Sequence, residues 1–175
     1  MHGKGDAFWR NIVWNFEQVV VQHAHAAGVN TRARSGYYKA AIILASSVAE
    51  ALAYRILEER LHGDVAADLL LEEDWQYFDC HNIPPQYGRD GMLLSLCQRR
   101  KQQFILTKQT DFKKVNEMCL RTGCFTKHFF KRVEMVRTRR NQIHIQGLKS
   151  LGRSWNKAQL DQVARVVTKL IRMTR

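Results

Sequence analysis

The stretch Ala40-Ala-Ile-Ile-Leu-Ala-Ser-Ser-Val-Ala-Glu-Ala-Leu-Ala-Tyr54 decides the fold, because Glu50 is its only charged residue. Ala45, Val48 and Leu52 recur at steps of three and four residues, which is the spacing of one helical face. Apolar residues also lie between these positions, and a helix that is apolar nearly all round is buried at the centre of a protein. We therefore expect this stretch to form a central helix with the remaining chain packed around it.

The same periodicity predicts four further main helices, so we expect an all-α, single-domain helical bundle over residues 1–175. The five helices are expected over residues 7–27, 37–62, 111–123 and 126–147, and from Ser154 towards the C-terminus. The expected N-caps are Asp6, Thr126 and Ser154, and the expected stops are Gly28, Gly63 and Gly147. Asp111 is expected to start the third main helix, which ends near Gly123. A polar connection is expected at residues 29–36, and a core face of the last helix at Leu160, Val163, Val167 and Leu170.

The segment between the second and third main helices is the least regular part of the chain. Asp64 is expected to cap a short helix through Leu71. Residues 72–91 are acidic and aromatic and contain Pro84-Pro85, so they are expected to form an irregular ordered loop. The pattern of residues 92–106 is ambiguous, and a helix is favoured.

Positive charge is concentrated in the last part of the chain. Residues 137–175 carry ten basic side chains and one acidic one, whereas residues 50–90 carry three basic and ten acidic ones, within a formal net charge of +12. Such asymmetry favours a polyanionic partner, of which nucleic acid is the commonest. A basic solubilising surface would produce the same pattern.

The start of the chain does not resemble a signal peptide, and no apolar run approaches the roughly 18 residues of a membrane helix. We therefore expect a cytoplasmic protein without membrane association. The four cysteines form no CxxC pair and are expected to stay reduced. Cys119, Cys124 and His128 lack the spacing of a common zinc site, so no metal and no cofactor are expected.

The second informative stretch is Arg140-Asn141-Gln142-Ile143-His144, inside the helix predicted over residues 126–147. Residues four apart are neighbours on one helical face, so Arg140 and His144 can converge on one bound group. Arginine matches the geometry of phosphate, and histidine exchanges protons near neutral pH. The pair therefore suits chemistry on a phosphodiester.

Together with the central helix, this cluster resembles the HEPN family (higher eukaryote and prokaryote nucleotide-binding), helical bundles found in bacterial toxins and defence ribonucleases. The late helix resembles the family's arginine–polar–spacer–histidine signature. Residues 37–52 resemble its second helix, which is rich in small residues and often carries an acidic or hydroxyl residue near the active site. The resemblance assigns that position to Glu50, which would orient Arg140 or His144.

The spacing leaves two candidates for the motif arginine. The family usually has four to six residues between arginine and histidine, whereas three follow Arg140 and four follow Arg139 before His144. Asparagine directly follows Arg140, as it often follows the family's arginine. Arg140 also lies about 40° from His144 around the helix axis, against about 140° for Arg139. An early end of this helix would favour Arg139 instead.

The resemblance implies a metal-independent endoribonuclease, in which the ribose 2′-hydroxyl attacks the adjacent phosphorus and a 2′,3′-cyclic phosphate remains. His144 would act as general base or acid. Arg140 would hold the phosphate and stabilise charge on its oxygens, and Asn141 would orient the phosphate or His144. Arg139 and Arg137 would add contacts to the RNA backbone.

The resemblance also implies partners. One histidine cannot easily serve as base and acid in one step, so a homodimer would bring two motif helices into one cleft. RNA would be the substrate, and a nucleotidyltransferase-like antitoxin would neutralise the enzyme. The main alternative is a non-catalytic helical module that dimerises and binds RNA or a protein partner. A helical DNA-binding regulator ranks last, because no helix-turn-helix pair is evident.

Overall fold

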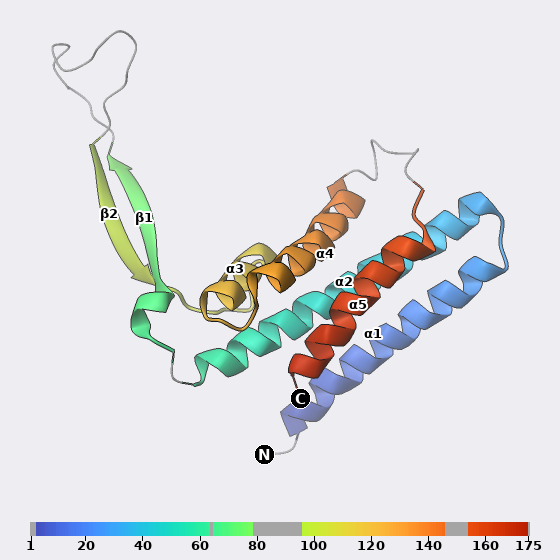
Figure 1. Ribbon diagram of the computed structural model, residues 1–175, viewed down its shortest axis with the longest axis horizontal. Helices are drawn as coiled ribbons and strands as arrows, with labels where there is room; N and C mark the ends of the chain where they lie inside the picture. The colour runs from blue at the N-terminus through green and yellow to red at the C-terminus, as the bar shows by residue number, and fades with distance from the viewer. Residues whose placement is uncertain (1–2, 64, 79–95, 146–153, 175) are drawn as a thin grey trace, which may run out of the picture.

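The central helix is the axis of the fold (Figure 1). The computed structural model describes residues 3–63, 65–78, 96–145 and 154–174, without the side chains of 3–6, 67, 73–78, 96–101 and 143–145. Helix α2 (Thr31–Leu61) contacts each of the other four helices, which are α1 (Gly3–Ala27), α3 (Phe112–Arg121), α4 (Lys127–Ile145) and α5 (Lys157–Met173). The prediction of an all-α bundle of five main helices is therefore confirmed.

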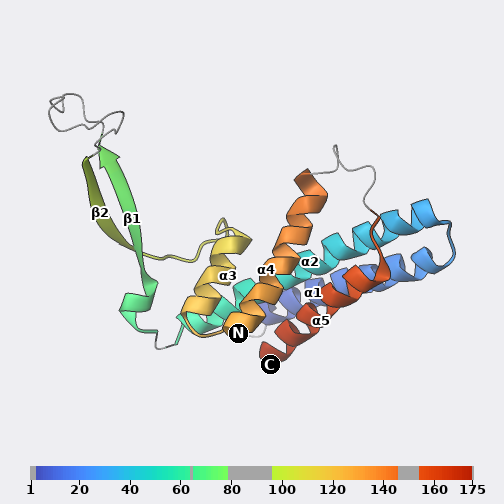
Figure 2. The same ribbon diagram turned by 45° about the horizontal axis from the view of Figure 1, so that its top comes forward.

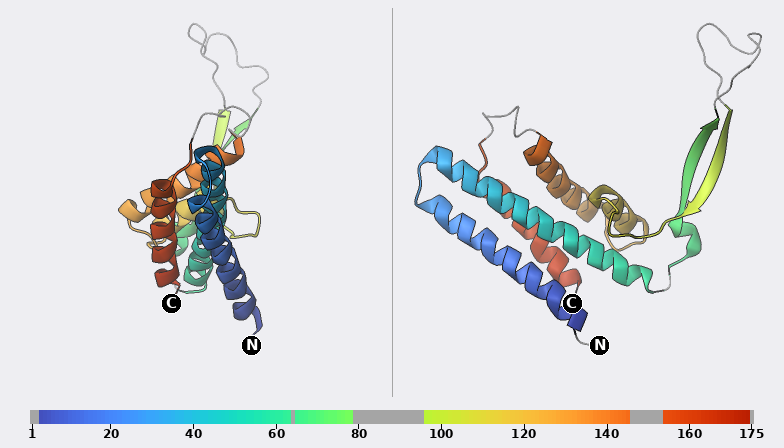
Figure 3. Two further views of the ribbon diagram at one scale, coloured as in Figure 1. Left: turned by 90° about the vertical axis from the view of Figure 1, so that its right-hand side faces the viewer. Right: turned by 180° about the vertical axis from the view of Figure 1, so that it is seen from behind.

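The four outer helices pack on different sides of α2. Helices α1 and α5 run alongside α2 (Figure 3), whereas α3 and α4 pack against each other and against α2 on another side (Figure 1). In Figure 2 a β-hairpin projects beyond the C-terminal end of α2, away from the other helices. This arrangement brings α2, α3 and α4 together at one place, and the candidate site lies there.

The core forms along α2 because its inward side chains exclude water. Ile42, Leu52 and Leu57 are each 0% exposed. The predicted core face of α5 is confirmed, since Leu160, Val163, Val167 and Leu170 are all buried. By length and hydropathy α2 could also span a membrane, but 56% of its most apolar window is buried inside the bundle, as expected of a core helix.

The second helix begins earlier than predicted. Residues 29–36 were expected to connect two helices, but α2 starts at Thr31, where the Asn30 side chain caps it by accepting from the backbone N–H of Ala33 at 3.0 Å. An exposed glycine such as Gly36 costs a helix only about 1 kcal/mol, too little to break one so strongly held by packing. Helix α1 likewise starts at Gly3, so Asp6 lies inside it and is not its N-cap.

The later helix starts follow capping chemistry. Thr126 caps α4 as predicted, and Asp111 caps α3, the helix that it was expected to start. Each accepts a hydrogen bond from the backbone N–H three residues further on. Helix α5 begins later than expected, because Asn156 rather than Ser154 is its N-cap. Gln159 completes a reciprocal capping box with Asn156, and this pair is stronger than a lone serine cap.

The segment after α2 was predicted only in part. The expected short helix is present as a 3₁₀ helix (Ala67–Leu70). Strand β1 (Leu71–Phe78) and the antiparallel strand β2 (Leu96–Gln103) follow, where a loop and a further helix were expected, and those two predictions were wrong. The register sets acidic positions of β1 opposite basic positions of β2, a stabilising pattern that lies too far apart in sequence for local periodicity to reveal. Asp64, Pro84-Pro85 and the rest of the loop at residues 79–91 lie outside the described residues.

Candidate functional site

An ion pair between α2 and α4 lies at the centre of the candidate site. Nη1 of Arg140 lies 2.6 Å from Oε2 of Glu50, and the two side chains are 30% and 31% exposed. The Nε atom of Arg140 is buried, and no described residue accepts a hydrogen bond from it. An unsatisfied buried donor costs roughly 1–3 kcal/mol.

A cavity of about 320 Å³ opens beside the ion pair. Its lining residues are Glu50 of α2, Asp111, Phe112 and Lys113 at the start of α3, and Arg137, Arg140 and Asn141 of α4. Four of the six residues predicted from the sequence are therefore brought together, namely Glu50, Arg137, Arg140 and Asn141. The helical spacing explains why three of them come from α4, because positions i, i+3 and i+4 share one face.

A chain of hydrogen bonds that begins on α3 holds Arg137 at the cavity. Glu134 accepts hydrogen bonds from Nε of Arg137 at 2.8 Å and from its Nη2, and Asn116 donates to the other Glu134 oxygen at 3.2 Å. The Arg137 guanidinium, helped by the Asn116 amide, holds the pKa of Glu134 below its usual range. The same carboxylate raises the pKa of Arg137. Since Asn116 is 0% exposed, this chain of hydrogen bonds is anchored in the core.

Arg139, the competing arginine, points to a different neighbour. Its Nη1 donates to the backbone oxygen of Gln159 at 3.0 Å, and its Nη2 donates to the Gln162 side chain, both on α5. Burial lowers the pKa of Arg139. Arg139 is thus a contact between α4 and α5, and the RNA-binding role expected for it has no support in this geometry. Of the two candidates, Arg140 is the one that faces the cavity.

The position at which α4 ends also bears on the choice between Arg139 and Arg140. The helix continues through Ile145, so His144 lies within it, one turn after Arg140. The early helix end that would have favoured Arg139 does not occur. The side chain of His144 and the expected stop at Gly147 lie outside the described residues.

The cavity has the composition of a site for a small anion. Its lining carries three cations (Lys113, Arg137 and Arg140) against two carboxylates, which gives a formal charge of +3 − 2 = +1. Each guanidinium is held by its own acid, so its remaining N–H groups stay oriented. Charge-assisted hydrogen bonds from arginine to phosphate are among the strongest in proteins. The arrangement therefore suits one phosphodiester group.

A second hollow adjoins the first and shares Glu50 with it. It has a volume of about 370 Å³ and includes Ser47, Tyr54, Lys108 and Thr110 in its lining. Its lining is more apolar than that of the first cavity, and it includes the aromatic ring of Tyr54 and the hydroxyl groups of Ser47 and Thr110. The two hollows that share Glu50 therefore offer different surroundings to a phosphate and to the rest of a nucleotide.

Sequence reasoning missed the residues that α3 contributes. Asp111 was recognised only as the start of a helix, and Lys113 and Phe112 were not singled out. Nothing in the local sequence distinguishes Lys113 from the other surface lysines. Its place at the cavity follows from the packing of α3 against α4, which brings residues more than twenty positions apart side by side.

Among the residues that the structure describes, no group of three or more histidine, cysteine, aspartate or glutamate side chains is placed to hold a metal ion. Comparison with protein-family models, curated proteins and solved structures yields no significant match to this chain. Any assignment of function therefore depends on the residues themselves.

The hydrogen bonds between Arg137 and Glu134 lead to a prediction about stability. Replacing Glu134 by glutamine should reduce the free energy of unfolding at pH 7 by about 1 kcal/mol, because it removes a charge-assisted hydrogen bond. The folded-state pKa of Glu134 lies below its unfolded value of about 4.3, so its contribution is present above that pH and is lost as pH falls through the lower folded value. Urea unfolding at pH 7 and near pH 3 should therefore give the larger difference between wild type and variant at pH 7.

Glu117→Gln is the matched control, because Glu117 forms a longer and more exposed ion pair, 3.8 Å from Lys113. It should change stability by less than about 0.5 kcal/mol. A loss for Glu134→Gln that is the same at both pH values would contradict the account.

Proposed function

We propose that this protein is a metal-independent endoribonuclease of the HEPN type. One observation carries the proposal: Arg140 of the Arg-Asn-x-x-His cluster pairs with Glu50 of the central helix, at a cationic cavity next to Asn141. The resemblance in sequence implied an acidic or hydroxyl residue of the second helix near the active site and assigned that position to Glu50. The ion pair supports this assignment through a contact that periodicity alone could not supply.

Each side chain then has a distinct part in the reaction. Arg140 and Arg137 hold the phosphodiester oxygens and stabilise the charge that builds there as the 2′-hydroxyl attacks phosphorus. His144, one turn beyond Arg140, removes the hydroxyl proton or donates one to the leaving oxygen. Lys113 adds a third cation from α3. Glu50 positions Arg140 and does not itself contact the reacting atoms.

The adjoining hollow supports RNA as the substrate class. The ring of Tyr54 and the hydroxyls of Ser47 and Thr110 provide stacking and hydrogen-bonding partners for a base or ribose next to the held phosphate. Single-stranded RNA can turn a base out into such a hollow more easily than a duplex can. The proposed substrate is therefore an unpaired stretch of RNA.

Two partners belong to this proposal. A homodimer would bring two copies of α4 together, so that one His144 serves as base and the other as acid. An enzyme of this kind is dangerous to the cell that makes it, so a neutralising partner of the nucleotidyltransferase-like antitoxin type accompanies the proposal. Both follow from the family resemblance and the chemistry of acid–base catalysis.

Cleavage of single-stranded RNA in EDTA tests the proposal. Removing a general acid–base group should slow cleavage by about 10²–10⁴-fold in His144→Ala. Removing a phosphate-stabilising donor should slow it by about 10²–10³-fold in Arg140→Ala. The same helix provides matched controls, since His128 and Arg132 are exposed and lie away from the cavity, and their alanine variants should cleave like the wild type.

Equal cleavage by the wild type and both site variants would refute the site assignment. A wild-type protein that binds RNA but cleaves none, with or without EDTA, would refute the enzymatic proposal and favour the binding module.

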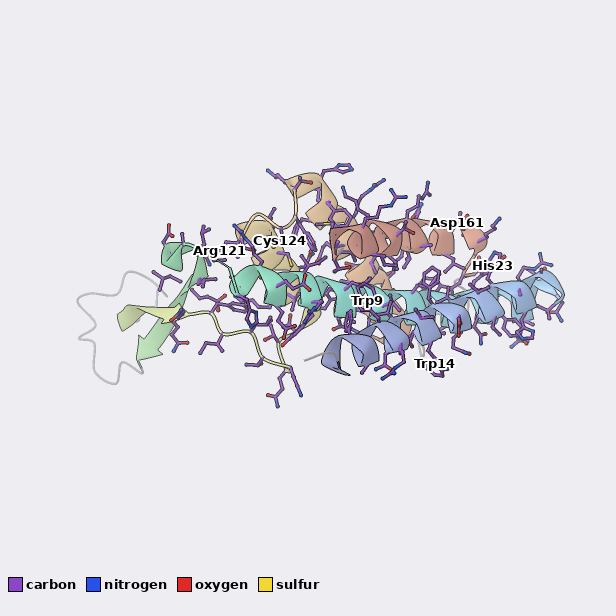
Figure 4. All side chains as sticks on the ribbon, turned by 90° about the horizontal axis from the view of Figure 1, so that it is seen from below. Trp9, Trp14, His23, Arg121, Cys124 and Asp161 are labelled. Carbon is purple, nitrogen blue, oxygen red and sulfur yellow. The ribbon has the colours of Figure 1, made fainter. Side chains whose placement is uncertain are left out.

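A second candidate function is a non-catalytic module that self-associates, and one surface favours it. On α1, Val13, Trp14, Val20 and Val21 are 42–59% exposed, beside an apolar groove of about 510 Å³. Trp14 points away from the bundle (Figure 4). Helix α1 carries Lys4, Asp6, Arg10 and Glu17 and is therefore neutral within a chain of net charge +12. Two copies could meet there without charge repulsion, and contiguous apolar patches of this kind commonly mark interfaces.

Trp14→Asp tests this surface. If α1 carries the dimer contact, the wild type should sediment as a dimer at micromolar concentration and Trp14→Asp as a monomer, because a carboxylate in the apolar contact would be desolvated. Ile105→Asp is the control, since Ile105 is 74% exposed and does not line the groove on α1. Identical sedimentation of all three proteins would exclude α1 as the self-association surface.

A further inference from the structure

Two free cysteines lie together where α3 turns into α4. Cys119, in the last turns of α3, is 0% exposed, and Cys124, two residues after the helix cap, is half-buried. The chain reverses at Gly123, whose φ of +79° is a conformation that glycine adopts without strain. The backbone N–H of Phe125 then donates to the Cys119 carbonyl at 2.9 Å, which folds Cys124 back over the end of α3. Figure 4 labels Cys124 in this turn, close to the C-terminal end of α2.

The surroundings treat the two sulfur atoms differently. The side chains of Cys119 and Cys124 lie in contact. The Cys119 thiol donates to the backbone oxygen of Ala53 in the core, at 3.6 Å. The Cys124 sulfur lies 3.4 Å from the Thr122 hydroxyl, which itself donates to the Met118 carbonyl at 2.7 Å. Cys119 is therefore held in the core, whereas Cys124 is the sulfur that solvent can reach.

A positive charge completes the site. Nε of Arg60, at the end of α2, donates to the backbone oxygen of Thr122 at 3.3 Å, which keeps its guanidinium beside the turn. The contact with the Cys119 thiol, together with the Thr122 hydroxyl and the Arg60 charge, lowers the pKa of Cys124 to about 6. The same contact and burial raise the pKa of Cys119. The lowered pKa of Cys124 favours its thiolate, the nucleophilic form of cysteine.

We propose that Cys124 and Cys119 form a peroxide-reactive thiol site, in which Cys124 is the attacking cysteine and Cys119 the resolving one. The Cys124 thiolate attacks one peroxide oxygen, the O–O bond breaks, hydroxide leaves, and Cys124 becomes a sulfenic acid. The Cys119 sulfur then attacks the Cys124 sulfur, and the sulfenic oxygen leaves as water with the proton of Cys119. In total, two thiols are oxidised to one disulfide, and one hydrogen peroxide is reduced to two waters.

This site is independent of the proposed ribonuclease activity, because none of its residues lines the cavity between Glu50 and Arg140. Its geometry also separates it from the zinc site rejected on sequence grounds, since no described group of metal-ligating side chains forms there. The ligand class is a small peroxide that can approach Cys124 from solvent. The product is a covalent link between the end of α3 and the turn that leads into α4.

The full chain carrying Cys80→Ser and Cys97→Ser tests the proposal, because only Cys119 and Cys124 then remain. After hydrogen peroxide, the intact mass should fall by two hydrogens, neither cysteine should accept a maleimide after denaturation, and dithiothreitol should restore both. In the same background Cys119→Ser should leave a sulfenic acid on Cys124 that dimedone traps. Cys124→Ser should slow thiol loss by about tenfold or more, because the remaining thiol is protonated.

Cys119→Ala is the second variant, in case the buried serine disturbs folding, and circular dichroism confirms that each variant remains helical. Two thiols that still accept maleimide after peroxide would overturn the proposal. So would a Cys124 that gains oxygen while Cys119 stays alkylatable, because Cys119 would then not act as the resolving cysteine. Equal rates of thiol loss in Cys119→Ser and Cys124→Ser would overturn the assignment of the attacking residue.

Discussion

The ion pair between Glu50 and Arg140 is the interaction on which the site depends. Glu50 is the only charge between Ala40 and Tyr54, in a helix otherwise committed to the core. A partly buried carboxylate pays a desolvation cost that it recovers only through a well-placed partner. Arg140, on the opposite helix, is that partner at 2.6 Å. The pair therefore fixes which face of α4 meets α2, and with it the direction of the whole cluster.

The remaining contacts hold this arrangement in place from other sides. Arg139 ties α4 to α5, so the adjacent arginines serve different neighbours and cannot exchange roles without turning the helix. Asn116 and Glu134 tie α4 to α3 and keep Arg137 beside Arg140. Each arginine at the cavity is thus oriented by a group that a ligand need not displace, and such preorganisation makes electrostatic stabilisation effective.

The sequence predicted the parts of this structure that depend on local patterns. The apolar surface of α2, the helix starts at Asp111 and Thr126, and the common face of Arg137, Arg140 and Asn141 all follow from spacing within one helix. The hairpin of β1 and β2 could not be predicted in the same way, because each strand gains its partner from a segment some twenty-five residues away. Packing also overrode propensity at Gly36, and it alone reveals Lys113 as part of the cavity.

A double-mutant cycle on Glu50 and Arg140, followed by both urea unfolding and RNA cleavage, tests the central claim most directly. If the two residues act as one unit, Glu50→Gln and Arg140→Gln should show a coupling of about 1 kcal/mol or more in the free energy of unfolding. The double variant should also cleave RNA no more slowly than Arg140→Gln alone. Additive effects in both measurements would contradict the account, because the two side chains would then contribute independently.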